Sequence, residues 1–217
     1  AAAKELEDIL TKRGRYEVVL TRNSDKDSRI KSSQRDELAR REALAREAGA
    51  ELFISLHADA LAEKAVRGGS VYTLSEQGTE RSAKIAKSEG DYVVYDLDLE
   101  RAENLDQVAK SIMLDVAQDR TITASSQLAD ALIDNLTGKT PLLNRSHRTG
   151  DLRVLLAPDV PAVLLEMAFI SNAKDEANLN SPVWRKRAMT AVADAIDQYF
   201  EEHQPRRVAG SAAGGAR

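Results

Sequence analysis

A short and almost uninterrupted apolar run at residues 51–57 is the feature that most constrains the fold of this chain. It reads Glu-Leu-Phe-Ile-Ser-Leu-His and follows Gly49, which ends a helix expected over residues 35–48. Apolar runs of this length are typical of strands that are buried on both faces, as in parallel sheets. A helix, a glycine and a buried strand form the second half of a β-α-β unit. We therefore predict an α/β fold with a mostly parallel, twisted sheet and helices on both faces.

Other segments of the chain carry comparable patterns. Helices are expected over residues 1–10 and 182–202, and strands over residues 16–22, 70–74, 152–156 and 162–166. Residues 81–136 are strongly helical and long for a connection between two strands, so we interpret them as a helical insertion. We expect residues 1–203 to form one domain and residues 204–217, which are rich in Ala and Gly, to form a flexible tail.

The charge of the chain and its lack of cysteine exclude several classes of protein. The net charge is −4, whereas a protein that binds nucleic acid without sequence preference needs a basic face to neutralise phosphates. With no cysteine, the chain has no disulfide, zinc–thiolate site or cysteine nucleophile. No apolar run reaches membrane-spanning length. We expect a monomer with neither a nucleic-acid partner nor a transmembrane segment.

Two polar residues stand at the ends of expected strands. His57 ends the first apolar run, and Glu166 directly follows Val163-Leu-Leu. In α/β sheets, ligands bind in the crevice beyond the carboxyl ends of the strands. A carboxylate after three aliphatic residues is costly unless it is paired, bound to a metal or facing a cleft. The pair suggests a metal ligand and a general acid or base, and the simpler alternatives are a satisfied histidine and a solvated glutamate.

Four segments, in order along the chain, resemble the N-acetylmuramoyl-L-alanine amidase family. Residues 19–25, Val-Leu-Thr-Arg-Asn-Ser-Asp, resemble its second strand and its Leu-Thr-Arg signature. Residues 38–60, which end in Phe-Ile-Ser-Leu-His-Ala-Asp-Ala, resemble its central segment. Residues 67–72 resemble the strand after the zinc histidine, and residues 154–172 resemble the segment with the catalytic glutamate.

This resemblance implies a function and a site. It implies hydrolysis of the amide between N-acetylmuramic acid and L-alanine in peptidoglycan, for cell-wall remodelling and daughter-cell separation in the periplasm. His57 would be a ligand of Zn²⁺, Glu166 the catalytic carboxylate, and Asp59 an acceptor behind the zinc ligand. The family's other zinc ligands are expected upstream of Ala1. We therefore expect this chain to lack the domain's first strand and the start of its first helix, and to be inactive by itself.

The insertion at residues 81–136 resembles that of the cell-division branch of the family. In that branch an inserted helix blocks the zinc with a glutamate until an activator protein with a LytM domain draws the helix away. By position, Glu103 is the candidate for this autoinhibitory residue and Glu100 is the next, with ordinary solvated charges as the alternative. The helix that follows is expected to carry apolar residues on one face, at Val108, Ile112 and Val116.

Other interpretations stay open. The domain could keep the fold without the metal and act as a peptidoglycan-binding or regulatory domain. His57, His147 and Glu166 could form an alternative metal triad, although residues 144–148 are interpreted as a surface loop. His203 is interpreted as a solvated residue of the last helix. An unrelated α/β hydrolase is the third possibility, but no Gly-x-Ser-x-Gly nucleophile turn occurs.

Overall fold

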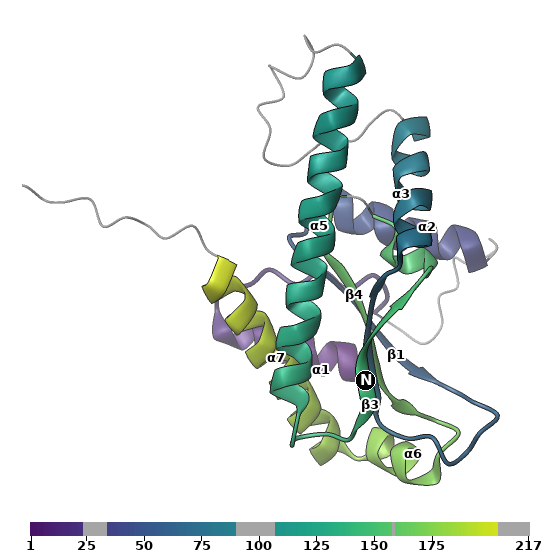
Figure 1. The fold of residues 1–217 in the computed structure, drawn as a ribbon. Helices are drawn as coiled ribbons and strands as arrows, with labels where there is room; N and C mark the ends of the chain where they lie inside the picture. The colour runs from purple at the N-terminus through teal and green to yellow at the C-terminus, as the bar shows by residue number, and fades with distance from the viewer. Residues whose placement is uncertain (24–33, 90–106, 158, 204–217) are drawn as a thin grey trace, which may run out of the picture.

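The computed structural model describes residues 1–23, 34–89, 107–157 and 159–203. Its centre is a four-stranded sheet in the order β1-β4-β2-β3 (Figure 1). The strands are β1 (Phe53–Asp59), β2 (Gly69–Leu74), β3 (Leu142–Gly150) and β4 (Ala162–Phe169). β1 is parallel to β4 and β2 is parallel to β3, whereas β2 and β4 are antiparallel. The predicted α/β class with a mostly parallel sheet is confirmed.

Helices cover both faces of the sheet. One face packs against α1 (Ala2–Arg13), α5 (Gln107–Leu136) and α7 (Pro182–His203). The other face packs against the short 3-10 helix η1 (Arg153–Leu155), which contacts α2 (Gln34–Glu47). α3 (Glu76–Glu89) contacts α5, and α6 (Ala173–Asn180) contacts α7 and β4. The flanking helices on both faces agree with the fold class expected from the sequence.

The sequence of β4 explains why the sheet needs cover on both sides. Val163 and Leu165 belong to the larger core with α1, α5 and α7. Ala162 and Leu164 belong to a smaller core with residues of η1. Successive side chains of a strand point to opposite faces, so a continuous apolar run is stabilised only between two apolar layers.

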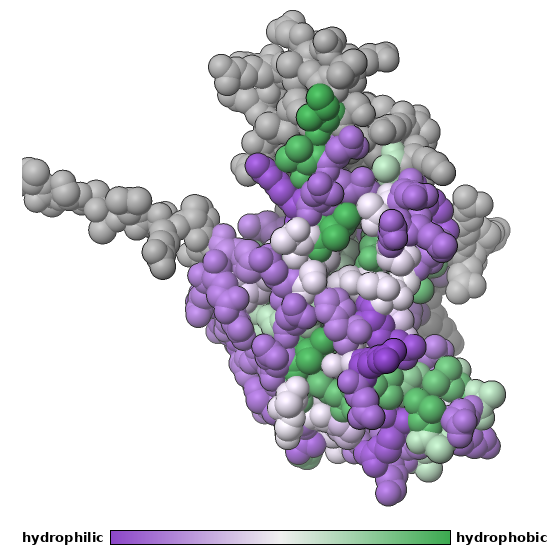
Figure 2. Space-filling model, in the orientation of Figure 1, coloured by the Kyte–Doolittle hydropathy of each residue, from purple (hydrophilic) through white to green (hydrophobic). Residues whose placement is uncertain are grey.

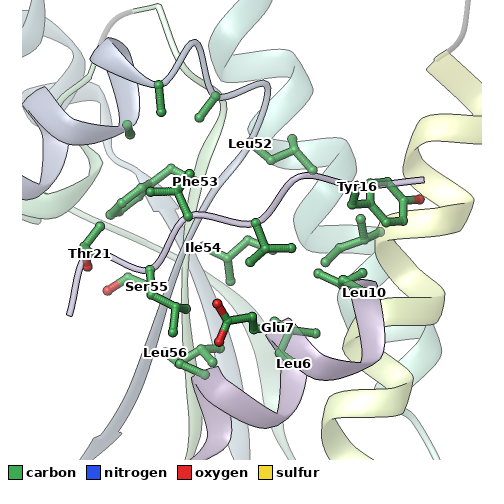
Figure 3. A pocket seen from close by; sticks show the side chains of 18 of the residues that line it. Leu6, Glu7, Leu10, Tyr16, Thr21, Leu52, Phe53, Ile54, Ser55 and Leu56 are labelled. Atoms are coloured by element: carbon green, nitrogen blue, oxygen red, sulfur yellow. The ribbon is translucent and has the colours of Figure 1, made fainter. Parts of the chain in front are cut away.

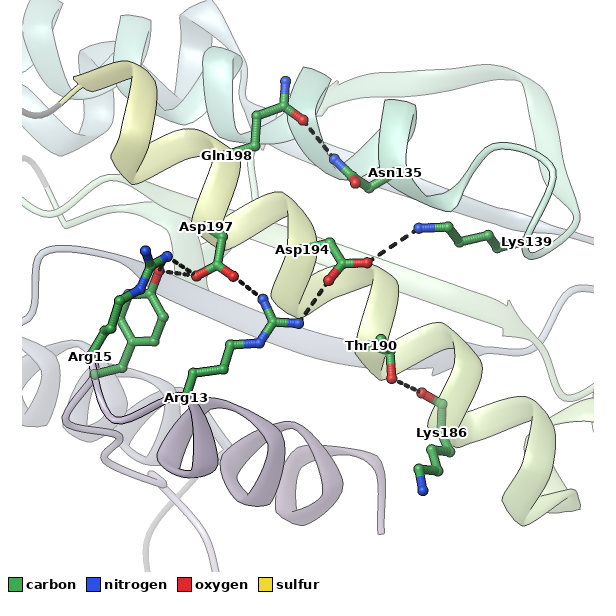
Figure 4. A network of polar contacts seen from close by, with 10 residues as sticks. Arg13, Arg15, Asn135, Lys139, Lys186, Thr190, Asp194, Asp197 and Gln198 are labelled. Atoms are coloured by element: carbon green, nitrogen blue, oxygen red, sulfur yellow. Dashed lines mark hydrogen bonds and ion pairs between the residues drawn. The ribbon is translucent and has the colours of Figure 1, made fainter.

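Charged residues join α1 to α7 at the edge of the larger core. α1 ends at Gly14, whose φ of 67° is the left-handed conformation that glycine adopts most easily. The guanidinium of Arg13 binds Asp194 at 2.7 Å and also Asp197 (Figure 4). Arg15 binds Asp197 as well. These contacts hold the first helix against the last.

Three expectations about strands are wrong. Residues 16–22 belong to no strand of the described sheet. Residues 152–156 contain η1, because a short buried apolar run has the same periodicity in a strand and in a tight helical turn. Residues 144–148, expected as a loop, lie within β3, an edge strand that is largely polar.

The insertion expected at residues 81–136 is only partly separate from the domain. α3 and the first part of α5 extend beyond the sheet (Figure 1). Towards the end of α5, however, Leu128 and Leu132 are fully buried in the larger core. The second half of α5 is therefore part of the domain.

The outer part of α5 carries apolar surface. Figure 2 shows hydrophobic residues along it, and Ile112 and Val116 are 58% and 47% exposed. The candidate residues Glu100 and Glu103 lie outside the described residues, as does the tail expected at residues 204–217. Among the helices that the structure describes, none is long and apolar enough to cross a membrane.

Candidate active site

The pairing of β1 with β4 places His57 beside Glu166. The two parallel strands stay in register from Phe53 opposite Ala162 to His57 opposite Glu166. Beyond the histidine the register shifts before Asp59. The apolar residues of both strands thus build the sheet, and their two polar residues arrive together at the carboxyl-terminal edge.

The two side chains lie close together but differ in exposure. His57 Nδ1 is 4.0 Å from Glu166 Oε1, and the side chains are 40% and 10% exposed, respectively. Glu166 Oε2 is buried and has no hydrogen-bond partner among the residues described. A buried carboxylate oxygen without a partner costs free energy. This atom is therefore suited to bind a group that the described residues do not supply.

The surroundings favour the neutral form of both groups. Burial and, to a smaller extent, the nearby charge of Asp59 raise the pKa of Glu166 to about 7, against a backbone hydrogen bond from Asp59 that lowers it. Burial also lowers the pKa of His57, as does the positive charge of Arg41. A neutral imidazole can act as a metal ligand, and a carboxylate with a pKa near 7 can accept or donate a proton at neutral pH.

A glycine on the neighbouring strand fixes the backbone of Glu166. β2 pairs with β4 so that Ser70 lies opposite Glu166. A Cβ atom on the preceding residue, Gly69, would lie 2.8 Å from the carbonyl oxygen of Glu166 and 3.1 Å from that of Met167. Real Cβ atoms essentially never lie within 3.0 Å of another heavy atom, so the contact with Glu166 would force the backbone to shift. Glycine is therefore needed at this position for the two strands to approach.

Comparison with known proteins decides the family. The model of a family described as N-acetylmuramoyl-L-alanine amidase matches residues 1–198. The chain belongs to this amidase family. It is 30% identical over 200 residues to the N-acetylmuramoyl-L-alanine amidase AmiA of Escherichia coli K12, and the match covers 92% of this chain and 66% of AmiA. The chain thus spans about two thirds of the length of this relative.

Solved amidase structures share the fold. Ami1 from Mycobacterium smegmatis superposes with a TM-score of 0.63 at 18% identity, over 93% of this chain and 74% of Ami1. CwlD from Clostridioides difficile, solved in complex with the GerS lipoprotein, gives a TM-score of 0.61 at 17% identity, over 93% of this chain and 84% of CwlD. At these identities the similarity supports the amidase fold of the chain.

The described residues of this amidase chain match zinc in donor chemistry but not in number. Imidazole nitrogen and carboxylate oxygen, as in His57 and Glu166, are donors that zinc accepts. A catalytic zinc ion usually has three protein ligands. Among the described residues, no group of three His, Cys, Asp or Glu side chains could hold a metal. A complete site would need donors from outside them.

Asp59 lies near the pair on the exposed end of β1. Its Oδ1 accepts a hydrogen bond from the backbone amide of Ala60 at 2.7 Å. Its charge acts on both groups, because it raises the pKa of Glu166 and opposes the lowering of that of His57. The role expected for Asp59 behind a zinc ligand stays a prediction.

Arg41 is a residue of the site that the sequence analysis missed. It lies on α2, forms an ion pair with Glu37 one turn earlier, and lines the same groove as His57. Its charge is close enough to lower the pKa of His57. No local pattern indicates this role, because α2 contains several arginines and only the packing of α2 shows which one approaches the histidine.

His147 does not join His57 and Glu166, so the alternative metal triad is wrong. It lies on β3, which is separated from β4 by β2. Its Nδ1 contacts Asp130 at 3.0 Å and its Nε2 contacts Thr73 at 3.2 Å, and these contacts tie α5 to the sheet. His203, expected to be solvated, is exposed and contacts the backbone carbonyl of Tyr199 at 2.7 Å.

Proposed function

We propose that this chain carries part of the catalytic machinery of an enzyme that hydrolyses the amide between N-acetylmuramic acid and L-alanine in peptidoglycan. Membership of the amidase family and the 4.0 Å approach of His57 to Glu166 support this proposal. The single observation that carries it is the buried, unpartnered Oε2 of Glu166 beside that imidazole. Cell-wall remodelling, daughter-cell separation and a periplasmic location are parts of the same proposal.

Glu166 is the proposed general base and acid. With a pKa of about 7 it is partly ionised at neutral pH, so it can accept a proton from the attacking water. It would then return this proton to the leaving amine of L-alanine. Because the Glu166 side chain is only 10% exposed, bulk water has little access to its carboxylate. The proton would therefore pass between this carboxylate and the reacting groups.

His57 is the proposed metal ligand. Its lowered pKa keeps the imidazole neutral, which is the form that binds a metal. When bound, zinc would polarise the scissile carbonyl and activate water. The described residues supply too few donors, so we expect zinc to bind this chain weakly and the complete site to take further ligands from outside them.

Substitutions of His57 and Glu166, with His147 as the control, test the proposal. In a chain extended upstream of Ala1, His57→Gln and Glu166→Gln should each lower the release of stem peptides from peptidoglycan by at least about 100-fold. His147→Gln should leave it nearly unchanged, because this residue lies two strands from β4. Unchanged activity in Glu166→Gln would exclude the proposed base.

The incomplete donor set favours a second candidate, a peptidoglycan-binding domain that works without metal. The two functions differ in a simple measurement. Sedimentation of the protein with insoluble peptidoglycan, together with its zinc content, distinguishes them. Tight binding with no zinc and no product, in the extended chain as well, would support the binding domain.

A partner protein and autoinhibition complete the proposal. The exposed Ile112 and Val116 on the outer part of α5 offer apolar surface for an activator, such as a LytM-domain protein. CwlD, which resembles this chain in fold, was solved with a lipoprotein. In the autoinhibited state, Glu103 or Glu100 would block the site.

A shortened insertion tests autoinhibition. Because the end of α5 belongs to the larger core, only residues 84–116, and not the whole of residues 81–136, should be replaced by a short linker. Autoinhibition predicts increased stem-peptide release from the extended chain, and an unchanged rate would refute it.

A further inference from the structure

Ser70 on β2 is a buried polar residue to which the proposed mechanism gives no task. The residue is 0% exposed, and its Oγ has no hydrogen-bond partner among the residues that the structure describes. A buried hydroxyl without a partner costs free energy, and most buried polar side chains in proteins have a partner. The surroundings of Ser70 therefore show which group its hydroxyl can serve.

Ser70 lies directly beside Glu166 in the sheet. β2 and β4 are antiparallel, and they pair Ser70 with Glu166 and Val71 with Leu165. Residues that lie opposite each other in such a pair point to the same face, with Cβ atoms about 4.5–5.5 Å apart. Val71 and Leu165 both belong to the larger core, so Ser70 and Glu166 share the other face. The two side chains are therefore neighbours.

His57 completes a row of three polar side chains across the sheet. It lies opposite Glu166 on the other side of β4. Figure 3 shows Leu56 beside α1 and Phe53 farther from that helix, in agreement with their places in the larger and the smaller core. Because side chains alternate along a strand, His57 lies on the same face as Phe53. His57, Glu166 and Ser70 thus stand side by side on three adjacent strands.

The two oxygens of the Glu166 carboxylate have different surroundings. Oε1 lies 4.0 Å from Nδ1 of His57, whereas Oε2 is buried and has no partner among the described residues. The torsion that turns a glutamate carboxylate is broad, so rotamer preference alone does not fix its plane. A hydrogen bond to one oxygen fixes this plane and thereby the direction of the other oxygen. A donor for Oε2 would therefore also hold Oε1 in place beside the histidine.

We propose that Ser70 is a positioning residue whose hydroxyl donates a hydrogen bond to Oε2 of Glu166. A serine side chain has three staggered rotamers, so its Oγ can turn towards a neighbouring carboxylate. The bond satisfies two buried atoms together and keeps Oε1 directed towards His57. Ser70 acts through Glu166 and does not touch the substrate. Its effect on catalysis rests on the proposed function, whereas the hydrogen bond itself does not.

A double-mutant cycle tests the hydrogen bond without an activity assay. At pH 8, where Glu166 is mostly ionised, Ser70→Ala should raise the unfolding equilibrium constant of this chain by at least about 5-fold, because the carboxylate loses its donor. In a Glu166→Leu background, which has no acceptor to lose, the same substitution should raise it by less than about 2-fold. Urea denaturation measures both constants. Equal effects in the two backgrounds would overturn the proposal.

The effect on catalysis is measured in the chain extended upstream of Ala1. Ser70→Ala should lower kcat for stem-peptide release by about 10-fold and leave KM within about 2-fold, because a loosely held carboxylate impairs the reaction and not substrate binding. The matched control is Ser125→Ala. Ser125 is also buried, and its Oγ accepts a hydrogen bond from the backbone amide of Ala162, at the other end of β4. Ser125→Ala should lower stability and leave kcat unchanged.

The two measurements separate this inference from the proposed function. If the extended chain is active and Ser70→Ala is equally active, the positioning role is refuted and the proposed function stands. If the extended chain with Ser70 intact releases no stem peptide, the proposed function fails. The double-mutant cycle then still decides whether Ser70 binds Glu166.

Discussion

β4 and β1 begin from nearly the same sequence pattern and reach different surroundings. Each is an apolar run that ends in a polar residue of the candidate site. Within the part of the chain that the structure describes, β4 has a strand on both edges and is buried along almost its whole length. β1 has a strand on one edge there, and Ser55 is its one buried residue. An apolar run therefore predicts that a strand needs cover on both faces, but it does not show which neighbouring element supplies that cover. β1 instead borders the groove that His57 and Arg41 line.

The largest expected difference between the strands is in their response to truncation. Leu165→Ala in β4 should lower the free energy of unfolding by about 2–5 kcal/mol, because Leu165 is 1% exposed and leaves a cavity. Leu56→Ala in β1 should cost roughly 1–2 kcal/mol, since that side chain is only partly buried. Urea denaturation followed by circular dichroism measures both. Equal losses would mean that β1 is covered in solution.

A buried aspartate provides a second contrast, because its backbone hydrogen bonds support the end of β4 and the residue before β2, and not β1. Asp175 Oδ2 accepts hydrogen bonds from the backbone amides of Gly68 at 2.7 Å and Phe169 at 3.1 Å. Asp175→Ala leaves these amides unpaired and should cost about 1–3 kcal/mol. The exposed neighbour Glu176 is the control, and Glu176→Ala should change the unfolding free energy little. A similar effect of both substitutions would contradict this role.

The pH dependence of stability sharpens the comparison at the strand ends. The pKa of Glu166 is about 7 in the folded chain against 4.5 as its ordinary value, so the folded state holds a proton that the unfolded state releases. The contribution of Glu166 is therefore complete below pH 4.5 and is lost as the pH rises to about 7, by on the order of 1–3 kcal/mol. His57 has the opposite sign, because its lowered pKa reduces stability as the pH falls below 6.5. Denaturation of metal-free Glu166→Gln should show a flatter profile between pH 4.5 and 7, and an unchanged profile would argue against the raised pKa.

The smallest effect is expected for α1, which lies beside β1 at the edge of the described sheet. Arg13→Met removes the ion pairs with Asp194 and Asp197 and should cost about 0.5–1 kcal/mol, because these groups are partly exposed. Hydrogen exchange should become faster in α1 and stay unchanged in β4. Faster exchange in both would mean that the two sides of the sheet are not independent.

The sequence predicted the parts of the fold whose pattern matches their environment. The first helix and the strands that carry His57 and Glu166 were expected, because helical spacing and burial leave local signals in the sequence. β3 could not be found, since an edge strand with polar side chains has no clear alternation. The proximity of His57 to Glu166 followed from the rule for strand ends, but the effect of Arg41 depends on how α2 packs, which no local pattern encodes.

Gly69 affects how the relatives of this chain can be judged. A single methyl group at this position would collide with the backbone of Glu166. A homologue could therefore retain both the histidine and the glutamate and yet carry the carboxylate in a displaced position. A survey that considers only the reactive side chains would count such a homologue as an active enzyme. The first position to inspect in a homologue is therefore that of Gly69, which contributes no functional group.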